Sequence, residues 1–332
     1  MTKQQLWLKV RDDVVKFWKF IVDNNPFTKQ QFHMFAEYVR RSWKSIAVMF
    51  PIFLLLYYCI GGYVTNNIDK NLNFEFKQDN NKLAVIDAGA YLIKREVDEN
   101  MWTPNLPFIF PGVVLDNMPS YQTGIMQTVR IWVKAMFEVN KTEELQRANE
   151  LLKYPPNIWL LSKGDDLALA PSSGAQYRKA KKELLEFNKH TEEYDNLNLQ
   201  SVEKILSLIE NNLNEISNNL ENQILEHSSD WVDFVADDIF YLNQGRIYAH
   251  YIMLKALSED IKQLIIETKQ YENLTSVFKA MKDAIAIHPS IIRNGQLRSV
   301  FTANHLMSLN YYISKAKYYL SVIKHDMREK NR

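Results

Sequence analysis

The feature that most constrains the fold is an uncharged, apolar run near the N-terminus. From Ser45 to Val64 the chain reads SIAVMFPIFLLLYYCIGGYV, and no charged residue lies between Lys44 and Asp69. A helix rises about 1.5 Å per residue, so a run of this length spans about 30 Å, the thickness of the hydrocarbon core of a bilayer. We therefore predict a transmembrane helix over residues 45–64, embedded in lipid. The alternative is a buried helix of a soluble protein.

The charges that flank this run predict its orientation. Residues 1–44 carry nine basic and four acidic side chains, hence a net charge of +5, whereas the whole chain carries only +1. Basic flanks are retained on the cytoplasmic side of a membrane. The predicted organisation is a cytoplasmic basic segment (1–44), a single membrane span (45–64) and a domain outside the cytoplasm (65–332). A basic segment of this length is too long for a cleaved signal peptide, so we expect the span to be retained.

Residues 5–23 have the composition of an amphipathic helix. Aromatic side chains such as Trp7 and Trp18 alternate with basic ones such as Lys9 and Lys16. This mixture suits contact with anionic lipid headgroups. A short cytoplasmic helix that packs on a partner protein is an equally good interpretation.

The remainder of the chain predicts an all-α, multi-helix domain with two long irregular loops. Glycine and proline are scarce, at 9 and 10 residues, and apolar residues recur with helical spacing. The two segments rich in proline and aromatic residues, 101–124 and 153–174, are the predicted loops. The predicted helices cover 82–99, 121–138, 142–153, 230–243, 245–269, 274–286 and 302–325.

Residues 175–226 contain neither proline nor glycine and carry a short heptad pattern between Val202 and Leu220. Because the pattern covers under three heptads, it favours a helical hairpin within the domain over a dimeric coiled coil. The single cysteine, Cys59, lies in the apolar run, so the domain has no disulfide or cysteine metal site. We expect no cofactor, and the near-neutral net charge gives no indication of nucleic-acid binding.

One acidic segment is the strongest candidate for chemistry. Glu226, Asp230, Asp233 and Asp237 recur at helical spacing. Paired carboxylates can bind a hard cation or act as acid and base. The alternatives are a solvated acidic face and buried ion pairs with Arg246. Weak catalytic candidates are Asp233, Asp237, Asp238, Arg246 and His250, and weak metal-ligand candidates are Asp233, Asp237 and Asp238.

The two predicted loops contain aromatic residues that allow two interpretations. They could line a ligand pocket, or they could fasten the long loops onto the helices. These residues are Trp102, Phe108, Phe110, Tyr121 and Trp159.

Several longer motifs, in order along the chain, carry a resemblance to a known family. They are MWTPNLPFIFPG, LDNMPSYQTG, LLKYPPNIW, PSSGAQYRKA, DFVADDIFYLNQGRIYAHYIMLKAL and TANHLMSLNYYISKAK. With them the chain resembles the bacterial family known as domain of unknown function 2333 (DUF2333). The resemblance implies a bacterial inner-membrane protein with a helical periplasmic domain. It brings no established activity and no assigned site residues.

The predicted function is therefore a membrane-anchored cell-envelope protein whose helical domain binds or scaffolds another envelope protein, without catalysis. No nucleotide-binding, serine-hydrolase or zinc-protease signature occurs in the sequence. Two alternatives stay open: a metal-dependent enzyme that uses the acidic segment, and a sensor that binds a small molecule or lipid at the aromatic loops.

Overall fold

The computed structural model describes residues 16, 19, 26–74, 82–160, 169–190, 197–227, 233, 235–296 and 303–330. The chain divides into two compact units, Met1–Ile60 and Gly61–Arg332. The predicted amphipathic segment 5–23 lies outside the described residues, apart from Lys16 and Lys19.

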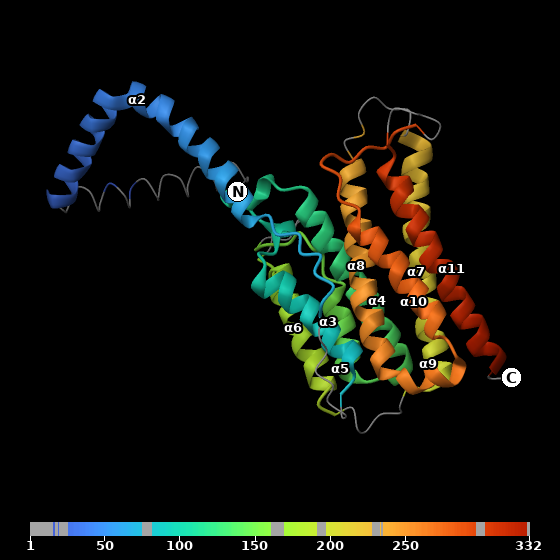
Figure 1. Cartoon of the computed structure of the whole chain (residues 1–332). Coiled ribbons are helices and arrows are strands. Elements are labelled where there is room, and N and C mark those ends of the chain that lie inside the picture. Colours follow the sequence, from blue (N-terminus) through green and yellow to red (C-terminus); the bar gives the residue numbers. More distant parts are fainter. Residues whose placement is uncertain are drawn as a thin grey trace, which may run out of the picture. The chain divides into compact units, whose positions relative to one another are not determined.

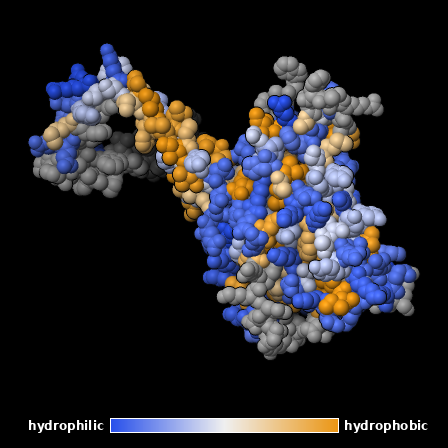
Figure 2. All heavy atoms as spheres, viewed as in Figure 1, coloured by the Kyte–Doolittle hydropathy of each residue, from blue (hydrophilic) through white to orange (hydrophobic). Residues whose placement is uncertain are grey.

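The first described element is the long helix α2 (Pro26–Thr65). Its stretch Ala47–Thr65 is apolar and long enough to cross a membrane, and only 6% of it is buried in the protein. Large side chains such as Phe53 and Leu55 are more than 60% exposed, and hydrophobic residues gather on the surface of α2 (Figure 2). The helical path continues through Pro51. A helix that exposes this much apolar surface differs from a core helix of a soluble domain, which hides its apolar face.

The second unit is helical, as the sequence predicts, and its described residues form no β-strand (Figure 1). An isolated antiparallel bridge joins Asn294 to Asn304. Its helices are α3 (Ala84–Lys94), α4 (Asn117–Asn140), α5 (Glu143–Leu152), α6 (Ser173–Phe187), α7 (Leu199–His227), α8 (Ala236–Asp260), α9 (Lys262–Thr268), α10 (Tyr271–Ala286) and α11 (His305–Lys330). A π-helical turn (Arg95–Glu99) extends α3, and 3₁₀ turns occur at Thr103–Asn105 and Pro111–Val114.

Helix α8 forms the centre of this unit. It packs against α3, α4, α7, α10 and α11, and buried residues recur on all its sides. The sequence predicted a break near residue 244, and this prediction is wrong. The helix continues through Gly245 and ends at Asp260. Gly245 does not interrupt the helix; it is needed for packing against a neighbouring helix.

That role is a close crossing between α4 and α8. A Cβ atom on Gly245 would overlap the backbone of Tyr121, and a Cβ atom on Gly124 would overlap the backbone carbonyl of Leu242. Each helix thus contributes one glycine where the other helix's backbone passes. The crossing brings α4 against the middle of α8 and fixes the positions of Tyr121 and Tyr248 beside each other.

One further boundary differs from the predictions. Helix α4 begins at Asn117, earlier than expected, because Pro119 lies in its first turn, where proline is tolerated. The proline-free stretch 175–226 forms two helices, α6 and α7. The heptad positions of α7 are buried within the unit, where α7 packs mainly against α11 and also against α4 and α8.

Candidate functional site

The predicted acidic site is divided among separate locations. Asp233 lies before α8 and accepts four hydrogen bonds. Gln223 Nε2 donates to its two oxygens at 3.0 and 2.9 Å. Asn294 Nδ2 donates at 3.0 Å and the backbone N–H of Val235 at 3.1 Å. Burial opposes the charge, but the hydrogen bonds from Gln223 and Asn294 outweigh it and lower the pKa of Asp233. This carboxylate joins α7 to the loop before α11.

Asp237 and Asp238 lie in the first turn of α8 and make few contacts. Asp237 Oδ1 accepts from the backbone N–H of Asp238 at 3.1 Å. Partial burial, together with nearby Asp116, raises the pKa of Asp237. Asp238 accepts a hydrogen bond from Ser120 Oγ of α4 at 2.7 Å. The ion-pair interpretation required a contact with Arg246, and neither carboxylate makes one; Arg246 pairs with Glu215 instead.

Arg246 points to another helix. Its guanidinium is almost fully buried and donates to Glu215 Oε1 of α7 at 2.9 Å. His250 lies one turn further along α8 and is fully buried. The Trp132 indole donates to its Nδ1 at 3.1 Å, and its Nε2 lies 2.8 Å from Asn212 Oδ1. Burial and the charge of Arg246 lower the pKa of His250 to about 3.

The described candidates thus take part in different polar contacts. No group of three or more His, Cys, Asp or Glu residues in the described part of the chain is arranged to hold a metal ion. Glu226 is exposed beside His227, and Asp230 lies outside the described residues. Each of the five candidates has a polar partner within the chain.

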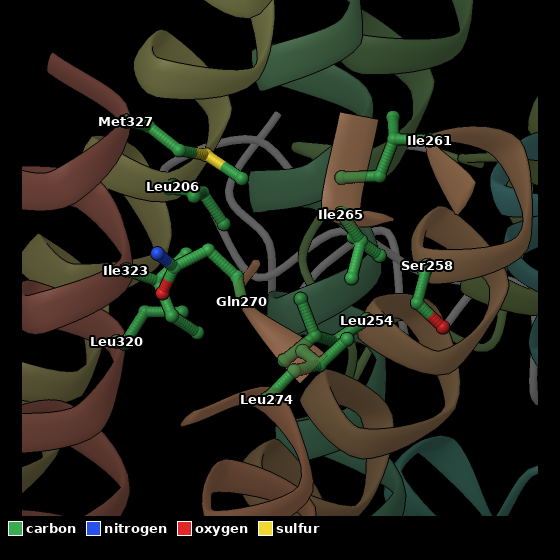
Figure 3. A pocket seen from close by; sticks show the side chains of 10 residues that line it. All are labelled: Leu206, Leu254, Ser258, Ile261, Ile265, Gln270, Leu274, Leu320, Ile323 and Met327. Atoms are coloured by element: carbon green, nitrogen blue, oxygen red, sulfur yellow. The ribbon is translucent and has the colours of Figure 1, made fainter. Parts of the chain in front are cut away.

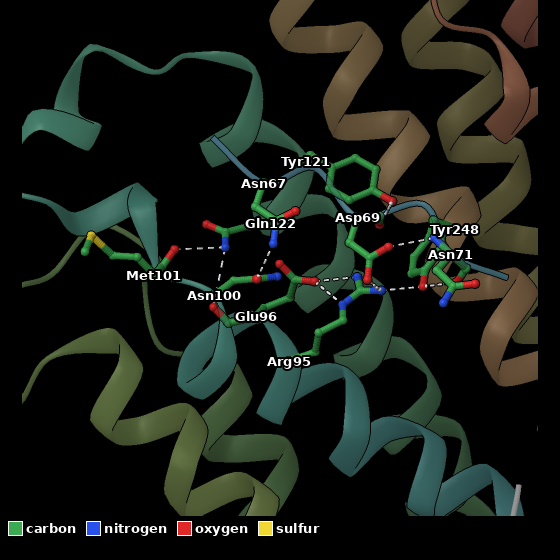
Figure 4. Close-up of polar contacts among 10 residues, drawn as sticks. All are labelled: Asn67, Asp69, Asn71, Arg95, Glu96, Asn100, Met101, Tyr121, Gln122 and Tyr248. Carbon is green, nitrogen blue, oxygen red and sulfur yellow. Dashed lines mark hydrogen bonds and ion pairs between the residues drawn. The ribbon is translucent and has the colours of Figure 1, made fainter. Parts of the chain in front are cut away.

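A second polar cluster was not predicted from the sequence. Figure 4 shows Arg95 at its centre, with side chains from the π-helical turn Arg95–Glu99, α4 and α8 around a segment that directly follows α2. We call residues 66–74 the strap and the cluster around Arg95 the clasp. Arg95 Nε donates to Glu96 at 2.6 Å, and both side chains are buried. Arg95 also donates to the Tyr248 hydroxyl and lies 3.6 Å from the carboxylate of Asp69 in the strap.

The clasp holds the backbone of the strap. Tyr121 OH donates to the carbonyl of Asp69 at 3.0 Å, and Tyr248 OH donates to the carbonyl of Asn71 at 2.7 Å. Further along, Lys255 Nζ donates to the carbonyl of Phe74 at 3.2 Å. Burial raises the pKa of both tyrosines, so they remain neutral donors. The strap therefore follows a fixed path over the helices.

One glutamine connects the clasp to the first predicted loop. The buried amide of Gln122 accepts from the backbone N–H of Thr103 at 2.9 Å and from its hydroxyl at 2.8 Å. It donates to the carbonyl of Met101 at 3.1 Å. Asn67 in the strap donates to Asn100 at 2.8 Å. The strap and the loop are thus fixed by the same group of side chains.

A family model matches the C-terminal part of the chain. The matching model is described as an uncharacterized protein conserved in bacteria (DUF2333). Residues 195–329 match DUF2333. No curated protein and no solved structure matches the chain.

The DUF2333 match confirms the resemblance inferred from the sequence over α7 to α11. It contains the last two of the six motifs on which the resemblance rested, and all five predicted site residues. The matched range includes one residue of the clasp, Tyr248. The other clasp residues, Asp69, Arg95 and Tyr121, lie before the matched range. The family description gives no activity.

Two hollows lie beside the DUF2333-matched helices. The smaller one has a volume of about 20 Å³ and is lined mostly by apolar side chains of α7, α8, α9, α10 and α11. Figure 3 shows these side chains. A cavity of this size holds about one water molecule. The larger is an open hollow of about 420 Å³ on α8, α9 and α10, lined partly by Tyr251, Lys255 and Phe278. Neither hollow is lined by the predicted acidic residues or by Arg95.

Proposed function

We propose that this chain is a single-pass protein of the bacterial inner membrane, with a cytoplasmic N-terminus and a periplasmic helical domain over residues 65–332. The domain acts without catalysis and binds another envelope protein. The basic segment 5–23 contacts anionic lipid on the cytoplasmic side.

The observation that carries the proposal is the exposure of the apolar stretch Ala47–Thr65. Only 6% of it is buried in the protein, although it has the length and composition of a membrane span. Exposed apolar surface of this extent is unfavourable in water, and a bilayer removes it from water. The excess of basic residues before the span favours a cytoplasmic N-terminus.

The state of the candidate residues supports a non-catalytic domain. A general base needs a free lone pair at the substrate. His250 has both ring nitrogens engaged by Trp132 and Asn212, and Arg246 is held by Glu215. The clasp is likewise occupied by the chain's own strap.

Topology is tested by reporter fusions to the full chain. Alkaline phosphatase fused after residue 332 is expected to be active, and green fluorescent protein at the same position is expected to be dark. Fusions after residue 44 form the matched control and should give the opposite pair of results. An inactive phosphatase together with a fluorescent reporter after residue 332 contradicts the proposed orientation.

A further inference from the structure

The two irregular segments of the domain expose a group of large apolar side chains. Phe108 is 77% exposed, and the side chains near it on the first segment are between 41 and 55% exposed. The second segment exposes Trp159 and Leu160 by 39 and 48%. We call this group the apolar rim; it consists of Phe108, Ile109, Val113, Val114, Trp159 and Leu160.

The two segments lie side by side. The rings of Phe110 and Trp159 meet edge to face with centroids 6.2 Å apart. Asn105 Nδ2 donates to the carbonyl of Ile158 at 2.7 Å. The rim is therefore one surface built by both segments, and adjoining apolar side chains of this kind mark an interaction surface.

Other aromatic residues of the same segments point inward. Trp102 is 5% exposed, donates to the carbonyl of Pro156 at 2.9 Å and packs edge to face on Tyr177. Tyr121 is also buried. The fastening interpretation therefore holds for Trp102, which ties the first segment to the second and to α6. Tyr121 belongs to α4 and holds the strap, and the rim faces outward.

The rim adjoins the last turns of the apolar helix α2. A Cβ atom on Gly61 would overlap the ring of Pro111, and one on Gly62 would lie 3.0 Å from Val114 Cγ2. A Cβ atom on Gly112 would lie 2.9 Å from Thr65 Cγ2. Glycine at these positions permits the close approach, as small residues do where elements pack within membranes.

This contact predicts the depth of the rim. Gly61 precedes the end of α2 by four residues, so it lies about 6 Å below that end along the helix axis. In a membrane-spanning α2, residues that touch Gly61 and Gly62 lie at the boundary between headgroups and acyl chains. Interfacial elements bury their apolar faces about 5–10 Å into this layer, and tryptophan is enriched there.

We infer that the apolar rim inserts into the periplasmic interface of the bilayer that α2 spans, so that the domain rests on the lipid surface. The inference depends on the proposed membrane anchor and adds a second lipid contact to it. The occupant of the rim is lipid because Val114 of the rim approaches Gly62, which belongs to the apolar stretch itself.

Spin labels in the full-length protein test the rim and the anchor separately. The native Cys59 is replaced by serine, and single labels are attached through Val113→Cys, Leu160→Cys, Ile266→Cys and Leu55→Cys. The proteins are reconstituted in vesicles of phosphatidylethanolamine and phosphatidylglycerol. Collisions of each label with oxygen, which concentrates in lipid, are compared with collisions with a water-soluble nickel chelate. A circular-dichroism spectrum equal to that of the unlabelled parent shows that each labelled chain is folded.

Ile266 on α9 is the matched control, because it is apolar and 62% exposed but does not belong to the rim. We expect oxygen collisions to dominate at 113, 160 and 55, and nickel collisions to dominate at 266. Nickel collisions at 113 and 160 with lipid exposure at 55 would overturn the rim and leave the anchor intact. Labels at 113 and 160 shielded from both reagents would show a protein-covered rim, which also overturns the inference. Water exposure at 55 would overturn the anchor.

Discussion

The indole N–H of Trp132 on α4 donates to Nδ1 of His250 on α8 across 3.1 Å, where both side chains are fully buried. An indole can only donate, so Nδ1 must be the unprotonated nitrogen of the ring. The proton then lies on Nε2 and is donated to Asn212 Oδ1 at 2.8 Å. His250 is thereby fixed as one neutral tautomer that links three helices.

This link predicts an acid-sensitive fold. The pKa of His250 is lowered to about 3, whereas an unfolded histidine has a pKa near 6.5. The unfolded state therefore binds the extra proton first, and stability that is complete above about pH 6.5 is lost as the pH falls towards 3. We expect a loss of about 2 kcal/mol between pH 7 and pH 5 from this group alone.

Chemical denaturation in detergent micelles at several pH values measures this loss. His250→Gln is expected to have a flatter dependence on pH than wild type. His288→Gln replaces an exposed histidine and should keep the wild-type slope. Equal slopes for wild type and His250→Gln would contradict the assignment.

The α4–α8 crossing predicts opposite effects for two glycine substitutions. Gly245→Ala places a methyl group against the backbone of Tyr121, and backbone cannot move aside as a side chain can. We expect a loss of roughly 2 kcal/mol or more. A methyl group from Gly89→Ala in α3 meets only side-chain atoms at ordinary van der Waals distance, Met253 Cε at 3.5 Å and Leu184 Cδ1 at 3.7 Å, and the substitution gains up to about 1 kcal/mol of helix propensity. Thermal unfolding distinguishes them; a Gly245→Ala protein as stable as wild type would refute the close crossing.

The acidic residues of the predicted site differ in structural importance. Asp233→Ala leaves the buried amide of Gln223 without its acceptor and removes one of the two acceptors of Asn294 Nδ2, which keeps the carbonyl of Gln223. We expect a loss of roughly 2–3 kcal/mol. Asp237→Ala removes one local hydrogen bond and a carboxylate whose pKa burial already raises. Its effect should stay under about 1 kcal/mol. Denaturant midpoints measure both, and the reverse order of stability would contradict the geometry.

The same carboxylates should show no response to cations. The separation of Asp233 from Asp237 and Asp238 predicts the same melting temperature with EDTA and with calcium, magnesium or manganese, because a ligand stabilises only the folded state that binds it. Thermal unfolding of wild type and Asp237→Asn provides the measurement. A cation-dependent rise in wild type that disappears in Asp237→Asn would favour the metal-dependent enzyme.

The clasp should depend on both members of its buried ion pair. Arg95→Met leaves the Glu96 carboxylate buried without its partner, and we expect a loss of about 3–5 kcal/mol. The double variant Arg95→Met with Glu96→Leu should recover part of it. Lys94→Met alters the exposed pair with Glu99 and is the matched control. Hydrogen exchange should also increase at residues 66–74 in Arg95→Met, because Arg95 contacts both Tyr248 and Asp69. Unchanged exchange at these residues would show that the clasp does not hold the strap in place.

The helical class and most helices could be predicted from the sequence, because apolar residues at helical spacing mark the buried face of each amphipathic helix. The sequence could not place the end of α8, since a helix that is buried on all sides has no polar face to give the pattern. It also missed the clasp. Arg95 and Glu96 look like ordinary surface charges in the sequence, and their partners Asp69 and Tyr248 are distant along the chain. Conversely, Asp233 and Asp237 have the right spacing for one helix face, but α8 begins between them, at Ala236.

The chain between the end of α2 and the first fixed residue of the strap is too short to act as a flexible linker. Asn67 is held by Met118 and Asn100 only two residues after Thr65, and two extended residues reach at most about 7 Å. On the proposed topology the domain cannot extend into the periplasm as a tethered module on a flexible linker would. If the domain binds an envelope protein, as proposed, its search for that partner is two-dimensional, along the membrane plane. Partners that are themselves membrane-bound then meet it at a high effective concentration, whereas a freely diffusing protein must come to the bilayer surface.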